Sequence, residues 1–134
     1  MNRLLLFFVV LMGITACSHD DYFAYMERDR DFCFEVAETL ALVNSEETAS
    51  LAAEKLKGYF LQAVGLKSQY EVMMNANMEG GSDERWEALE ERGLAFQRIV
   101  DEAERIRLNP SHWAYIELPL RELVEALGVL DWNR

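Results

Sequence analysis

The sequence has very few of the residues that carry acid–base, nucleophilic or metal chemistry. Its 134 residues include two histidines, His19 and His112, and two cysteines, Cys17 and Cys33. Zinc and di-metal sites use characteristic spacings such as H-E-x-x-H, C-x-x-C or a Glu-x-x-His pair, and many hydrolases use G-x-S-x-G. None of these motifs occurs. We therefore expect a protein that is not an enzyme and that holds no cofactor and no metal.

Two weaker metal-binding alternatives stay open. Met73, Met74 and Met78 could offer thioethers to copper, although methionines at helical spacing typically fill gaps in a core. Two groups of glutamates could attract cations, although solvated helix faces explain such groups more simply: Glu35 with Glu38, and Glu87 with Glu90 and Glu91. The sequence does not decide between these readings.

Basic residues are scarce as well. The chain has 13 lysines and arginines against 24 aspartates and glutamates, a formal net charge of −11. Binding to nucleic acid requires clustered lysine and arginine, and adhesion to anionic lipid requires a basic face. The composition therefore argues against nucleic acid and against direct adhesion to a lipid surface, and it leaves cationic partners open.

The apolar run near the start of the chain is too short to cross a membrane. It covers residues 4–16 and follows Asn2 and Arg3. A helix of that length rises roughly 20 Å, whereas the hydrocarbon core of a bilayer is about 30 Å thick. A positive start, a short apolar stretch and small residues at its end are typical of a secretory signal. We predict that residues 1–16 are a cleaved signal peptide.

The end of this leader carries a more specific pattern. Residues 14–17, Ile-Thr-Ala-Cys, resemble the lipobox of bacterial lipoproteins. The resemblance implies cleavage between Ala16 and Cys17, diacylglycerol on the thiol of Cys17, and a fatty acid such as palmitate on the new amino group. Several acyl chains, at about 0.8 kcal/mol per buried methylene, give a lasting anchor.

The residues after Cys17 indicate to which membrane the lipoprotein is delivered. Ser18 is not the aspartate that retains lipoproteins of the enteric type at the inner membrane, so the resemblance implies a lipid anchor in the outer membrane of the bacterial cell envelope. Residues 19–21, His-Asp-Asp, are also similar to short surface-export signals. Whether the protein faces the periplasm or the cell surface therefore stays open.

These assignments set the organisation of the chain. With Cys17 acylated, Cys33 has no partner for a disulfide, and we expect it in the core between Phe32 and Phe34. The predicted segments are a signal peptide (1–16), a lipidated tether (17–21) and a single helical domain (22–134).

The domain shows helical periodicity and no convincing strand. Apolar residues at three- and four-residue steps predict helices over about 21–43 and 46–78, and a third from residue 83 to the break at Asn109-Pro110. Ser45 should cap the second of these helices. Beyond the break, we expect Ser111 to cap a turn over 112–117 and Pro119 to open a helix over 120–130.

The expected fold class is all-α. Gly80-Gly81 should end the second helix, so that the second and third helices form an antiparallel hairpin. The other helices would extend this hairpin to a three- or four-helix bundle that follows the helical signal segment.

The second helix carries a long apolar stripe and two unexpected glycines. The stripe consists of Ala49, Ala52, Leu56, Tyr59, Phe60, Ala63, Leu66, Tyr70, Met73 and Met74. Gly58 and Gly65 are one heptad apart, and each is unfavourable inside a helix. They could share a face that another backbone approaches closely, and tolerance of glycine at a solvent-exposed face explains them equally well.

A second resemblance covers two stretches of the domain. The segments ETLALVNSEETASLAAEKLKGY and LNPSHW resemble small uncharacterised helical lipoproteins of bacteria, in which an A-A-x-K-[LI] helix precedes an N-P break. The resemblance implies no activity.

The aromatic residues of the last quarter are the remaining candidates for binding. Trp113, Tyr115 and Trp132 either close the end of the bundle or form a platform for a partner. We expect a lipid-anchored envelope protein that acts as a non-catalytic interaction or scaffold module. Its partners would be the membrane, through the acyl chains, and another envelope protein. The alternative is an envelope lipoprotein that binds a small ligand or a cation.

Overall fold

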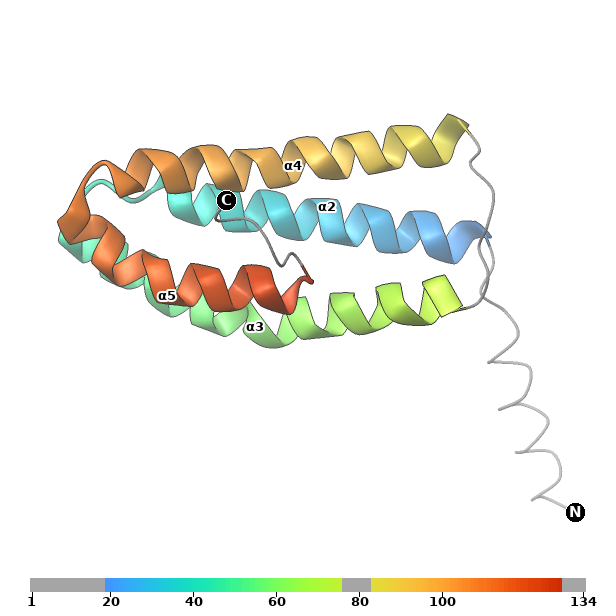
Figure 1. The fold of residues 1–134 in the computed structure, drawn as a ribbon, viewed down its shortest axis with the longest axis horizontal. Coiled ribbons are helices and arrows are strands. Elements are labelled where there is room, and N and C mark those ends of the chain that lie inside the picture. Colours follow the sequence, from blue (N-terminus) through green and yellow to red (C-terminus); the bar gives the residue numbers. More distant parts are fainter. Residues whose placement is uncertain (1–18, 76–82, 129–134) are drawn as a thin grey trace, which may run out of the picture.

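The protein is a helical bundle (Figure 1). The computed structural model describes residues 19–75 and 83–128, which form α2 (His19–Ala41), α3 (Glu46–Asn75), α4 (Asp83–Arg107) and α5 (Pro110–Ala126), with no strand among them. The predicted all-α fold class is therefore confirmed. Outside the described residues lie the predicted signal peptide and lipidation site with Ala16 and Cys17, the Gly80-Gly81 turn, Met78 and Trp132.

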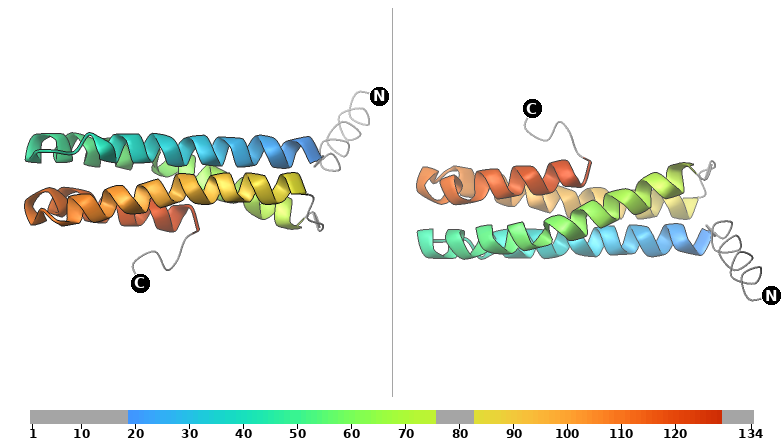
Figure 2. Two further views of the ribbon diagram at one scale, coloured as in Figure 1. Left: turned by 90° about the horizontal axis from the view of Figure 1, so that it is seen from above. Right: turned by 90° about the horizontal axis from the view of Figure 1, so that it is seen from below.

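The helices form two antiparallel hairpins that lie side by side (Figures 1 and 2). α3 returns along α2, and α5 returns along α4, while α2 packs against α4 and α3 packs against α5. Contacts between α2 and α4 join residues at a nearly constant distance in the sequence, namely Asp29–Arg92, Phe34–Arg98 and Leu40–Arg105. A constant offset means that these two helices run parallel.

The predicted pairing of the helices on either side of Gly80-Gly81 is not observed. The described parts of α3 and α4 have no close backbone contact, and the nearest neighbour of α4 is α2. Contacts from α4 explain this choice. Arg92 binds the buried carboxylate of Asp29, and Arg105 donates hydrogen bonds to the carbonyl oxygens of Leu40 (3.0 Å) and Val43 (2.9 Å).

The contacts of Arg105 also lie at the C-terminal end of α2. The last carbonyl groups of a helix have no partner within it and carry a partial negative charge. A guanidinium from α4 binds one of them, that of Leu40, and also the carbonyl oxygen of Val43 in the turn between α2 and α3.

Hydrogen bonds at the start of α3 confirm the predicted cap. The Ser45 hydroxyl accepts a hydrogen bond from the amide of Thr48 at 3.1 Å, and the Thr48 hydroxyl accepts one from the amide of Ser45 at 2.9 Å. Glu46 and Glu47 occupy the first turn, where the helix dipole favours negative charge. At the other end of the hairpin, α2 begins two residues earlier than predicted, so residues 19–21 of the predicted tether belong to the helix.

The prediction for the last segment was wrong. Residues 110–126 form one continuous helix, capped by Asn109 rather than Ser111: the Asn109 side chain accepts hydrogen bonds from the amides of Ser111 and His112. Pro119 lies inside this helix, where a proline costs roughly 3 kcal/mol. Its neighbours on the same face are all buried and offset that cost by packing on the rest of the core: Ile116, Leu120, Leu123 and Val124.

The core lies between the two hairpins. Its largest fully buried side chains are Phe32, Leu40, Leu56, Ile99, Ile106, Ile116, Leu120 and Leu123. Cys33 is buried among them, as predicted. Phe60 and Tyr70, which the stripe of the second helix placed in the core, are instead 42% and 40% exposed. Phe60 faces the seam between α3 and the last turns of α5, beside Glu122 and Ala126, rather than the core between the hairpins.

Candidate functional site

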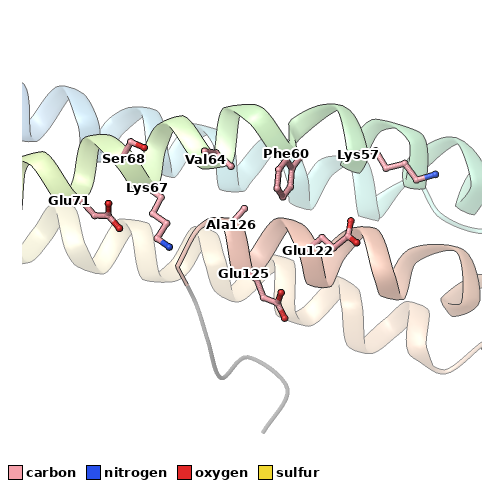
Figure 3. A pocket seen from close by; sticks show the side chains of 9 residues that line it. All are labelled: Lys57, Phe60, Val64, Lys67, Ser68, Glu71, Glu122, Glu125 and Ala126. Carbon is pink, nitrogen blue, oxygen red and sulfur yellow. The ribbon is translucent and has the colours of Figure 1, made fainter.

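A groove lies between α3 and α5, and we call it the α3/α5 groove (Figure 3). It has a volume of about 760 Å³. Its lining residues are Lys57, Phe60, Val64, Lys67, Ser68 and Glu71 of α3 and Glu122, Glu125 and Ala126 of α5. The groove lies where the last turns of α5, from Glu122 to Ala126, face α3, which continues past them to Asn75.

The floor and the walls of the groove differ in chemistry. Phe60, Val64 and Ala126 give an apolar floor between the two helices (Figure 3). The α3 wall carries Lys57, Lys67, Ser68 and Glu71, and the polar groups of the α5 wall are Glu122 and Glu125. Six of the nine lining residues are thus polar or charged, so an occupant has to match charge as well as the apolar floor.

The two lysines differ in their partners. The ammonium group of Lys57 lies 2.9 Å from a carboxylate oxygen of Glu54 on the exposed side of α3. Lys67 forms no ion pair with any described residue, and its side chain passes close to Gly128, which follows α5 with a φ of +87°. A ligand can therefore form an ion pair with Lys67 without breaking an existing one.

A second polar cluster is buried between α2 and α4. The Asp29 side chain is 1% exposed and accepts a hydrogen bond through Oδ2 from Nε of Arg92. Its Oδ1 has no hydrogen-bond donor among the described residues. Tyr25 and Cys33, one turn away from Asp29 on either side, are also buried. The centroids of the Tyr25 and Tyr70 rings are 6.0 Å apart.

Burial dominates the electrostatics of this cluster. It raises the pKa of the Cys33 thiol to about 12, and the negative charge of Asp29 acts in the same direction. Burial and Asp29 also raise the pKa of Tyr25. A thiol is nucleophilic only as the thiolate. Cys33 is therefore protonated and inert at neutral pH, and the cluster has the character of a structural element.

The raised pKa of Cys33 makes the protein less stable in alkali. The ordinary value is 9.0, so the contribution of Cys33 is complete below pH 9 and is lost as the pH rises toward 12. In that range we expect the free energy of unfolding to fall by up to about 1.4 kcal/mol per pH unit for this one group. Urea unfolding at several alkaline pH values measures the slope. Cys33→Ala should make the slope smaller, most clearly between pH 9 and 10 where Tyr25, with its ordinary value of 10.0, does not yet contribute. An unchanged slope would contradict the assignment.

The residues predicted for partner binding lie apart from the groove. Trp113 is half-buried near the start of α5, and the Arg107 guanidinium lies over its ring at 4.7 Å. Tyr115 is 43% exposed. The groove begins further along α5, at Glu122, so these aromatic residues and the groove are separate surfaces.

The described residues provide no metal site for the methionines or for the glutamate groups. Met73 is buried in the core, and the side chain of Met74 lies outside the described part of the structure. Over the residues whose positions are described, no three histidine, cysteine, aspartate or glutamate side chains gather where they could hold a metal ion.

Sequence reasoning missed the groove, although one signal pointed to it. All three lysines of this acidic chain, Lys55, Lys57 and Lys67, lie within 13 residues of α3, and two of them line the groove. Phe60 was assigned to the core because its spacing fits the stripe. The stripe cannot reveal which of its members face the seam with α5 rather than the core.

Two further findings concern the whole chain. Within the described ranges, 19–75 and 83–128, no helix combines the length and the apolar character required to span a membrane. Comparison with known proteins gives no matching family model, no similar curated protein and no similar solved structure.

Proposed function

We propose that this chain is a lipid-anchored, non-catalytic interaction module of the bacterial cell envelope, and that it binds its partner in the α3/α5 groove. The observation that carries the binding role is the apolar floor of Phe60, Val64 and Ala126 in the seam between α3 and α5. The anchor rests on the signal pattern of residues 1–16 and on the lipobox resemblance that ends at Cys17.

The shape and charge of the groove favour a segment of another protein as the occupant. Apolar side chains of an amphipathic helix can fill a groove of this kind at helical spacing. The α3 wall offers Lys57 and Lys67 together with Glu71, and the α5 wall offers Glu122 and Glu125, so a helix with basic groups toward α5 and acidic groups toward the two lysines would be matched. The envelope protein partner would then be recognised by both its apolar face and its charge pattern.

The volume of the groove also supports the second candidate function, binding of a small ligand. Pockets for small molecules range over about 300–1,000 Å³, and this groove lies within that range. A ligand with an apolar body and an anionic group would place that group against Lys67, which has no ion pair of its own among the described residues.

The test is photo-crosslinking in intact bacterial cells from a benzoylphenylalanine placed at position 60. We expect a discrete protein adduct from position 60 and none from position 118, because Leu118 is 58% exposed on α5 but does not line the groove. A small mass increase in place of a protein adduct would support the ligand candidate. Equal labelling from both positions would remove the groove as the binding site.

A matched pair of substitutions tests the same surface without a probe. We expect Phe60→Asp to abolish co-purification of the partner, because a carboxylate in the apolar floor must be desolvated when the partner binds. Leu118→Asp introduces the same charge on exposed α5 and should have no effect. Circular dichroism checks that both variants keep their helices. Undiminished co-purification with Phe60→Asp would contradict the proposal.

A further inference from the structure

Pro119 interrupts the hydrogen bonding of α5 near its middle. It lies inside the helix Pro110–Ala126 and is buried. Proline has no amide N–H, so the hydrogen bond that a helix normally forms at this point, from residue 119 to the carbonyl oxygen of Tyr115, cannot form. Sharp bends in helices occur at such positions. α5 therefore consists of two halves that are joined by a weakened turn.

The α5 residues that line the α3/α5 groove all follow Pro119. They are Glu122, Glu125 and Ala126, and Figure 3 shows them on the last turns of α5, beside α3. The half of α5 that precedes Pro119 contributes no lining residue to this groove. The weakened turn thus separates the α5 wall of the groove from the rest of the helix.

The half of α5 before Pro119 is held by directional contacts. The side chain of Asn109 accepts hydrogen bonds from two amides of the first turn. The guanidinium of Arg107, at the end of α4, lies 4.7 Å from the centroid of the Trp113 ring. Trp113 in turn packs against the core. These contacts tie the start of α5 to the end of α4.

The half after Pro119 is held to the other helices by apolar packing. Leu120, Leu123 and Val124 are fully buried. Among the described residues, no hydrogen bond or ion pair joins residues 120–128 to another helix. Apolar contacts have no preferred direction. A small pivot of this half can therefore shift its packing without leaving a polar group unpaired.

The charged groups of the two walls do not fix the width of the groove. Glu122 and Glu125 of α5 share the groove with Lys57 and Lys67 of α3. No ion pair joins these two walls in the described structure, since Lys57 is paired with Glu54 on its own helix.

One ion pair within α5 spans Pro119. Nη2 of Arg121 donates a hydrogen bond to Oε1 of Glu117 at 2.7 Å. Both side chains are partly exposed to solvent, and exposed pairs of this kind contribute little to stability. The pair is a weak tie between the two halves of α5 and does not replace the missing backbone bond.

We propose that the turn at Pro119 is a hinge, and that residues 120–126 form a movable wall that pivots on it to fit the groove to its occupant. A pivot at this point changes the separation between Ala126 and the α3 residues of the floor, Phe60 and Val64. A few residues that absorb a change of direction are sufficient for such a motion. The use of the hinge in binding rests on the proposed function, whereas the hinge itself does not.

Hydrogen exchange of the full chain in detergent tests the hinge. In Pro119→Ala the new amide can donate to the carbonyl of Tyr115. We expect the amides of residues 120–126 to exchange about tenfold more slowly relative to those of α2, the effect of one added hydrogen bond. Pro110→Ala is the matched control, because Pro110 occupies the first turn, where no such bond forms. Unchanged exchange in Pro119→Ala, or equal slowing in α2, would overturn the hinge.

A second variant keeps the buried proline and changes only the surface. Glu117→Gln removes the tie to Arg121, so we expect the amides of residues 120–126 to exchange about twofold faster, the contribution of one helical ion pair. The amides of residues 113–118 should be unaffected. A rise of the same size in residues 113–118 would mean that α5 opens as one unit. That result, or no rise at all, would contradict the hinge.

Photo-crosslinking from position 60 in cells tests the use of the hinge in binding. We expect Pro119→Ala to lower the yield of the protein adduct several-fold, because a stiffer wall fits the partner less well, and Pro110→Ala to leave it unchanged. Slower exchange with an undiminished adduct would overturn the role of the hinge in binding. Absence of an adduct from the chain with both prolines would instead contradict the proposed function, and hydrogen exchange would still decide on the hinge.

Discussion

Replacing Arg92 by methionine should lower the free energy of unfolding by about 3–5 kcal/mol, the range for removal of one partner from a buried ion pair. Asp29 is 1% exposed, and Arg92 is the cation bound to it. Without the guanidinium, the carboxylate stays buried in the α2·α4 interface with no compensating charge. A loss of this size is a large share of the total stability of a small domain. The midpoint of urea unfolding measures it.

Two further variants separate the ion pair from general packing. Changing both partners, Asp29→Leu with Arg92→Met, should recover most of the lost stability, because an apolar pair needs no compensation. Arg98→Met on the same helix removes a cation that lies 5.4 Å from the Phe34 ring and should cost only about 0.5–1 kcal/mol. If Arg92→Met costs no more than Arg98→Met, Asp29 does not depend on its arginine.

The buried pair of Asp29 and Arg92 also shows why the sequence predicts where helices begin but not which helices pack together. Helix starts depend on a few adjacent residues, and the cap at Ser45 was accordingly predicted correctly. The choice of α2 as the neighbour of α4 depends on contacts such as Asp29–Arg92, which join residues 63 positions apart. A glycine pair at residues 80–81 indicates where a helix ends and carries no information about its neighbour.

α5 shows that a local signal can also predict a helix start where there is none. Locally, Pro119 is a strong signal for a helix start. It was misleading because the energy that holds α5 together comes from burial of one whole face, including Ile116 and Leu120, against the bundle. Tertiary packing of this kind overrides local propensity and becomes visible only with the structure.

The candidate site was unpredictable for a related reason. The α3/α5 groove is formed by residues of two helices that are distant in sequence, and its position depends on how the last turns of α5 pack against α3. Periodicity identified the side of α3 on which Phe60 lies but not the extent to which α5 covers it. The concentration of lysines on α3 was the only local sign that this helix differs from the others.

Replacing Cys17 by alanine should abolish incorporation of labelled palmitate and leave the precursor uncleaved. The lipobox resemblance of residues 14–17 places the diacylglycerol on this thiol, and alanine cannot form the thioether. Cys33→Ala is the matched control. Because Cys33 is buried in the core, its removal should leave both labelling and cleavage intact.

Labelling and precursor size are the decisive measurements for this prediction, and membrane fractionation is not. An uncleaved precursor keeps the apolar residues 4–16, which can themselves hold it at a membrane, so the Cys17→Ala chain can sediment with membranes even when it has no lipid. A mature lipoprotein depends instead on its acyl chains, since one chain gives only marginal binding and several give a lasting anchor. Label on the Cys17→Ala chain, or cleavage of its precursor, would remove both the lipid anchor and the argument that places this acidic bundle at a membrane.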